Sequence, residues 1–195
     1  MIHHLRGRMI EKSPTHAVIE CGGVGYYVHI SLHTFGKLPE DESCMLFTHQ
    51  VIREDAHMLF GFATEEERSI FVKLISVSGV GATTGRMILS SLSPDEVKQA
   101  IYSQDVPTIQ GIKGIGAKTA QRIIVDLHDK IQKEDASSFE KTAVGGNRNK
   151  SEALSALSSL GFDKAKSEKT LEKILMQEGN DIALEELIKR ALKQL

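Results

Sequence analysis

Short apolar runs separated by turn residues fill the first third of the chain. The runs are HAVIEC at 16–21, GYYVHIS at 25–31, CMLFTHQVI at 44–52 and HMLFGF at 57–62. They are rich in the β-branched and aromatic residues that strands favour, and glycine, proline and charged clusters lie between them. Five or six short strands in so few residues predict a small closed β-barrel of the OB type over residues 1–63.

From Thr64 the period of the apolar positions changes to that of a helix. Ile70, Phe71, Leu74 and Ile75 follow at helical spacing. Thr64 with Glu67 has the pattern of a capping box, and a second helix start follows at Ser93-Pro94-Asp95-Glu96. The pattern predicts four or five short helices with glycine turns over residues 64–133.

Residues 134–150 show no apolar period and are rich in serine, glycine, asparagine and charge. We expect a flexible linker there. Apolar residues return at helical spacing beyond it and predict three helices, at about 151–159, 164–177 and 181–194. The expected architecture is therefore a multidomain α and β chain, whose last domain is a small three-helix unit over 151–195.

Charge is distributed unevenly along the chain, whose formal net charge is −2. Residues 1–64 sum to −2 and residues 134–195 to −1, whereas residues 65–133 sum to +1. Residues 106–125 hold three basic side chains and no acid. A local basic face can bind a polyanion whatever the total charge is.

The two cysteines, Cys21 and Cys44, match no metal or redox spacing. The N-terminus lacks the apolar core of a signal peptide, and no apolar run is long enough to cross a bilayer. We therefore expect free thiols in a reducing cytoplasm and no membrane partner.

The helical part contains an internal repeat. Residues 79–84 and 114–119 both read Gly-apolar-Gly-Ala-x-Thr, 35 residues apart, with an arginine in the next turn of each copy. This spacing predicts two helix-hairpin-helix motifs, in which the glycines admit a ligand close to the backbone and the following helix directs its free N–H groups at a phosphate. Such contacts hold DNA without reading its sequence. One such turn alone is more often a packed loop, but two aligned copies favour nucleic-acid binding.

The residues predicted to contact the DNA backbone come from both copies. They are Ser78, Gly79, Val80, Gly81 and Arg86 in the first, and Lys113, Gly114, Ile115, Gly116, Lys118, Thr119 and Arg122 in the second. Thr83 and Thr84 stand where the second copy has Lys118 and Thr119, so we expect the second hairpin to be the stronger clamp.

With MIHHLRGRMIEK at the start, VIREDAHMLFGF at 51–62 and the paired GVG and GIG hairpins, the chain resembles the RuvA family over nearly its whole length. The resemblance implies binding of four-way Holliday junctions, held open and square-planar by a homotetramer, or by an octamer on DNA. It also implies the RuvB ATPase motor and the RuvC resolvase as partners, with ATP hydrolysis in RuvB and no catalysis in this chain.

Two further sites follow from the same resemblance. Arg53, Glu54 and Asp55 match the acidic pin of the family. Carboxylates repel phosphates, so a pin at the centre of a junction would select open crossovers rather than add affinity. In the C-terminal domain, LSSLGF at 157–162 resembles the helix-turn of UBA-like (ubiquitin-associated-like) three-helix domains. The candidate contacts to the motor there are Leu157, Leu160, Gly161 and Phe162.

Two other classes of function stay open at this point. A helix-hairpin-helix glycosylase or nuclease would need a base-flipping pocket or clustered carboxylates, for which Asp126 and Asp129 are the only nearby candidates. A single-strand binder would need stacking aromatics, and the chain has no Trp. We expect no cofactor and no metal, because the chain has neither a phosphate-binding P-loop nor a metal-ligand spacing.

Overall fold

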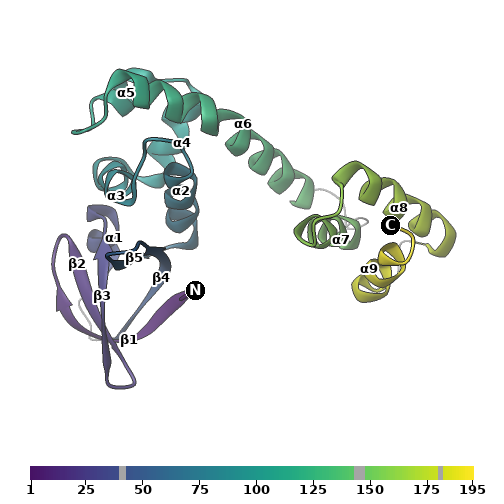
Figure 1. Ribbon diagram of the computed structural model, residues 1–195, viewed down its shortest axis with the longest axis horizontal. Helices are drawn as coiled ribbons and strands as arrows, with labels where there is room; N and C mark the ends of the chain where they lie inside the picture. The colour runs from purple at the N-terminus through teal and green to yellow at the C-terminus, as the bar shows by residue number, and fades with distance from the viewer. Residues whose placement is uncertain (40–42, 143–147, 180–181) are drawn as a thin grey trace. The chain divides into compact units, whose positions relative to one another are not determined.

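The computed structural model describes residues 1–39, 43–142, 148–179 and 182–195, and the side chains of these residues except 132–142 and 148. The chain forms two compact units, Met1–Lys133 and Glu134–Leu195. The first unit holds a β-barrel and a group of helices, and the second holds further helices (Figure 1). The predicted boundary between residues 63 and 64 falls inside the first unit.

Five strands close into a barrel in the order β1-β2-β3-β5-β4, which confirms the predicted OB-type barrel. They are β1 (His4–Lys12), β2 (His16–Cys21), β3 (Val24–Ile30), β4 (Ser43–Ile52) and β5 (His57–Phe62). Neighbouring strands are antiparallel except β3 and β5, which run parallel and pair only at two positions. Alternate residues of β2 and β4, such as Ala17, Ile19 and Leu46, point into the barrel core.

A short helix, α1 (Leu32–Lys37), follows β3 directly. Ser31 is its N-cap and accepts a hydrogen bond from the Thr34 backbone N–H. This short helix lies between β3 and β4 in the chain. Two polar side chains at its start, Ser31 and Thr34, donate hydrogen bonds to Glu67 in the helical part of the same unit.

Helices make up the rest of the first unit. They are α2 (Glu65–Ile75), α3 (Ala82–Ser91), α4 (Pro94–Tyr102), α5 (Val106–Gln110) and the first part of α6 (Ala117–Thr142), which runs past the end of this unit at Lys133. Their core includes two barrel residues, Phe60 and Phe62 of β5. The centroids of their rings lie 5.1 and 4.8 Å from the ring centroid of Phe71 on α2. The barrel and the helices therefore share buried surface within one unit.

The second unit contains α7 (Arg148–Ser159), α8 (Lys164–Glu178) and α9 (Leu184–Leu192). Their small core is built from Ala153, Leu157, Leu171, Ile174, Leu187 and Ala191. The bounds of these helices along the chain agree closely with those of the three helices that the apolar spacing predicts.

The flexible linker expected over 134–150 differs from the structure where residues are described. Helix α6 continues to Thr142 and α7 begins at Arg148, while 143–147 lie outside the described residues. The sequence has no glycine or proline between Ala117 and Thr142, so nothing in its backbone chemistry stops the helix from propagating.

Candidate nucleic-acid interface

The two predicted hairpins have the same local geometry. In the first, the Val80 N–H donates to the Val77 carbonyl at 3.0 Å, and in the second Ile115 donates to Ile112 at 3.1 Å. Gly79 and Gly114 have φ angles of +92° and +89°, which a residue with a Cβ adopts only with strain. The glycine in each copy is therefore required by the turn itself.

The apolar residue between the glycines points into the protein. Val80 and Ile115 are each 5% exposed and belong to the core of the first unit. Their buried side chains attach the hairpins to the core, so these two residues can contact a ligand only through their backbone groups. Ser78, Gly79, Gly81, Lys113, Gly114 and Gly116 are exposed on the outer side.

Each hairpin leads into a helix whose first N–H groups lack intrahelical acceptors. Gly81 is the N-cap of α3, where no side chain caps the helix, and the Gly85 N–H is the first to bond back, to the Gly81 carbonyl at 2.8 Å. In the second copy Ala120 donates to the Gly116 carbonyl at 2.9 Å. The N–H groups before these, with the positive end of the helix dipole, suit an oxygen of a phosphate.

The space in front of these helix starts is open. A Cβ built on Gly81 or on Gly116 would meet no atom within 4 Å, and neither residue has a positive φ. Glycine at these two positions is therefore not required by the protein's own packing. It leaves room for an external group to approach the backbone.

One arginine links the two hairpins. The Arg122 guanidinium, on α6 just after the second hairpin, donates to the Ser78 carbonyl in the first at 3.3 Å. Arg122 is exposed, as are Lys113 and Lys118, whereas Thr119 is half-buried. Arg122 thus holds the hairpins together while its positive charge stays at the surface.

Arg86 does not occupy the position of Arg122 in the repeat. At the 35-residue offset Arg86 aligns with Gln121, and Met87 aligns with Arg122. The half-buried Arg86 donates to the Thr15 carbonyl, in the turn between β1 and β2, at 3.0 Å. Arg86 therefore takes part in the contact between α3 and the barrel, and its contact with DNA stays a prediction.

Two pKa shifts concern residues in the barrel and before the second hairpin. Burial, followed by the nearby charges of Arg86 and His16, lowers the pKa of His29 on β3. Hydrogen bonds from the Thr108 hydroxyl and backbone N–H lower the pKa of Asp105, the N-cap of α5. Asp105 stays ionised as the cap that fixes the helix leading into the second hairpin.

The acidic tip lies in the turn between β4 and β5. The Arg53 N–H donates to the Ala56 carbonyl at 2.8 Å and closes the turn. Arg53, Glu54 and Asp55 are all exposed. The tip is continuous with β5, whose phenylalanines lie in the same core as the helices.

One of the C-terminal predictions needs correction. Leu157 is fully buried in the core of the second unit, so its side chain is not available to a partner. Leu160 and Phe162 are 61% and 37% exposed, on either side of Gly161, which ends the turn with a φ of +91°. The small core explains the error, because it needs most of the leucines of its helices.

Among the described residues no three His, Cys, Asp or Glu side chains gather as a metal site would require. Asp126 and Asp129 are both exposed on α6. No described helix combines the length and the apolar character needed to cross a bilayer.

Sequence reasoning missed the role of Glu67. Thr64 does cap α2, accepting from the Glu67 N–H at 3.1 Å, but the Glu67 side chain does not complete the expected capping box. It is fully buried and accepts hydrogen bonds from Ser31 and Thr34 instead. The local signal was the same as for a true box, which does form at Ser93 and Glu96.

Two helix-hairpin-helix motifs on one core, beside an OB-type barrel, define a protein of the helix-hairpin-helix DNA-binding class. Family models agree along the chain: "RuvA N terminal domain" matches residues 1–61, "SAM-like Helix-hairpin-helix tandem" 71–129 and "RuvA, C-terminal domain" 149–195. The chain belongs to the RuvA family.

Similar proteins cover the whole chain. A protein of Christiangramia forsetii is 55% identical over 195 residues, and one of Flavobacterium psychrophilum is 52% identical over 196, with complete coverage of both chains in each comparison. A protein of Cytophaga hutchinsonii is 46% identical over 197 residues and 99% of each chain. All three are named Holliday junction branch migration complex subunit RuvA.

The two glycines of the second hairpin should respond differently to substitution. Gly114→Ala places a Cβ on a backbone with positive φ and should lower the free energy of unfolding by about 1–2 kcal/mol. Gly116→Ala places a Cβ in open space at ordinary φ and should lower it by less, about 0.5 kcal/mol, because the position before a helix favours glycine over alanine. Denaturant unfolding of both variants measures the difference, and equal losses would contradict the hairpin geometry.

Proposed function

We propose that this chain binds four-way DNA junctions and holds them open for branch migration by a partner motor. The observation that carries the proposal is the pair of equivalent hairpins, tied together by Arg122, with open space before each helix start. The names of its relatives, which place them in a Holliday junction branch migration complex, support the same function.

Each hairpin offers backbone N–H groups to a phosphate oxygen and offers no base-reading side chain. Grip of this kind is independent of sequence, as a protein acting at any recombination intermediate requires. Lys113 and Lys118, both exposed, add charge to the second hairpin. The first hairpin then holds DNA through its amides and the hydroxyls of Ser78 and Thr83.

The acidic tip supplies the preference for a junction. Glu54 and Asp55 would repel a continuous duplex laid across the barrel, because both side chains are exposed and are negatively charged, as the phosphates are. At a crossover the strands diverge and leave room for the tip between them. The tip thus acts by excluding the wrong substrate, which gives selectivity rather than affinity.

The assembly and its partners complete the proposal. One protomer for each arm predicts a homotetramer, which could pair as an octamer around the DNA. The second unit is the proposed docking module for the RuvB ATPase, with Leu160 and Phe162 as exposed apolar contacts. RuvC would act on the same open junction, and ATP hydrolysis would belong to RuvB.

A competition experiment tests the proposed function. The wild-type chain should bind a synthetic four-way junction at least about tenfold more tightly than a linear duplex of the same sequences. Glu54→Gln with Asp55→Asn should leave junction binding nearly unchanged and raise duplex affinity by about fivefold, since a unit charge near a phosphate costs on the order of 1 kcal/mol in water. Equal wild-type affinities would contradict junction selectivity, and Mg²⁺-dependent cleavage of either DNA would favour a nuclease.

The charge contribution of the second hairpin can be measured separately. Lys113→Ala with Lys118→Ala should weaken duplex and junction binding alike. It should also reduce the slope of log affinity against log salt by about 2, because a protein that makes two fewer phosphate contacts releases fewer counterions when it binds. Lys37→Ala, which removes an exposed lysine from α1, is the matched control and should leave the slope unchanged. An unaltered slope in the double variant would place the DNA elsewhere.

A further inference from the structure

The Glu67 carboxylate is buried at the point where three segments of the first unit meet. Its Oε1 accepts from the Ser31 hydroxyl at 2.5 Å, and its Oε2 accepts from the Thr34 hydroxyl at 2.8 Å and the Ala63 N–H at 3.3 Å. Ser31 and Thr34 belong to the start of α1, and Ala63 follows β5. A single side chain from the first turn of α2 thus binds two parts of the barrel.

These contacts are costly to replace. The Glu67 side chain is removed from water, so its oxygens depend on the protein's own donors. Each donor is also fixed by a second bond: Ser31 accepts from the Thr34 N–H at 2.9 Å, and Thr34 accepts from the Ala63 N–H at 3.2 Å. We call this set, Ser31, Thr34, Ala63 and Glu67, the buried network.

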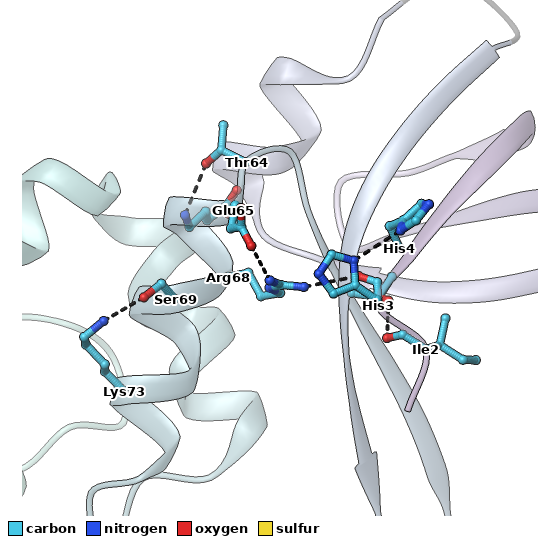
Figure 2. A network of polar contacts seen from close by, with 10 residues as sticks. Ile2, His3, His4, Thr64, Glu65, Arg68, Ser69 and Lys73 are labelled. Atoms are coloured by element: carbon cyan, nitrogen blue, oxygen red, sulfur yellow. Dashed lines mark hydrogen bonds and ion pairs between the residues drawn. The ribbon is translucent and has the colours of Figure 1, made fainter. Parts of the chain in front are cut away.

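Surface contacts continue the attachment on both sides of the buried network. On α3, Ser90 accepts from the Leu32 N–H at 3.1 Å, and Arg86 donates to Thr15. On α2, Arg68 donates to the His3 carbonyl at 3.3 Å and to Glu65 at 2.7 Å (Figure 2). Except for the Arg68–Glu65 pair, which lies within α2, these bonds join a helix of the hairpin-bearing group to the barrel or to α1.

The apolar contact beneath these bonds does not fix an orientation by itself. Phe60 and Phe62 pack on Phe71, but burial of apolar surface is non-directional. Hydrogen bonds have narrow geometry, and those to a charged acceptor are the stronger ones. The polar contacts, with Glu67 at their centre, therefore add directional restraints to this apolar packing between the barrel and the helices.

We propose that Glu67 is a positioning residue for junction selectivity: through the buried network it fixes the acidic tip on the barrel relative to the two hairpins. The inference rests on the proposed function. Both hairpins lie in the helical core and are joined by Arg122, so their spacing does not depend on the barrel. The tip at Glu54 and Asp55 belongs to the barrel, so its placement between the DNA arms does.

The proposal separates two affinities that a general loss of stability would change together. Loosening the buried network should leave the grip of the hairpins on duplex intact. It should leave junction binding nearly unchanged and raise duplex affinity, because a tip that no longer holds one position excludes a continuous duplex less well. A residue that served only the stability of the fold would alter both affinities, or neither.

Two conservative substitutions test this. Thr34→Val keeps the side-chain shape and removes the hydroxyl that joins Glu67 to Ala63, and Glu67→Gln keeps the volume and removes the charge. In each variant we expect duplex affinity to rise by about fivefold, as it does when the charges of the tip are removed, and junction affinity to stay within about twofold of wild type. Amide hydrogen exchange at Ala63 should become faster while exchange in the barrel core is unchanged.

Ile101→Val is the matched control, since Ile101 is fully buried in the helical core away from the buried network. It should lower stability and leave the ratio of junction to duplex affinity as in wild type. The proposal is overturned if Thr34→Val and Glu67→Gln keep the wild-type ratio, or if they lose both affinities in parallel. An unchanged rate of amide hydrogen exchange at Ala63 in Thr34→Val would also overturn the positioning role of Glu67. If the wild-type chain itself shows no preference for a junction over a duplex, it is the proposed function that fails.

Discussion

A helix that begins without a side-chain cap leaves several backbone N–H groups in need of an acceptor. In the part of the chain that the structure describes, two helices, α3 at Ala82 and α6 at Ala117, begin after a glycine hairpin with open space before the helix start, and no side chain caps α3. The rest of the first unit keeps these starts accessible and in a fixed relation. Val80 and Ile115 anchor the hairpins in the core, and Arg122 joins one to the other. The unmet hydrogen-bonding need of the backbone is thus preserved for a ligand.

A backbone grip of this kind has no selectivity of its own, since every duplex presents phosphates. Selectivity requires a second element that acts against the wrong substrate. In the proposed function the barrel provides one in the exposed carboxylates of Glu54 and Asp55. Attraction and repulsion come from different parts of one unit, so their relative placement matters as much as either charge. That placement gives the buried Glu67 a role that its distance in sequence from both sites does not suggest.

The sequence was a good guide wherever a local pattern determined the structure. Short runs of β-branched and aromatic residues predicted the barrel, and the repeated glycines predicted both hairpins, because a positive φ at Gly79 and Gly114 is a local requirement. It was a poor guide where tertiary contacts decided the outcome. Arg86 and Arg122 look alike in sequence, yet one binds the barrel and the other bridges the hairpins. The capping pattern at Glu67 gave no sign that donors more than thirty residues away would take its carboxylate.

The central claim, that DNA phosphates approach the backbone at the helix starts, is tested most directly at Gly81 and Gly116. A Cβ there meets no protein atom, so Gly81→Ala and Gly116→Ala should fold as the wild type does. Titration of a labelled four-way junction should nevertheless show affinity reduced by about tenfold for each variant, because the added methyl group occupies the path of the phosphate to the amides. Wild-type affinity in both variants, with stability near that of the wild type, would contradict the account.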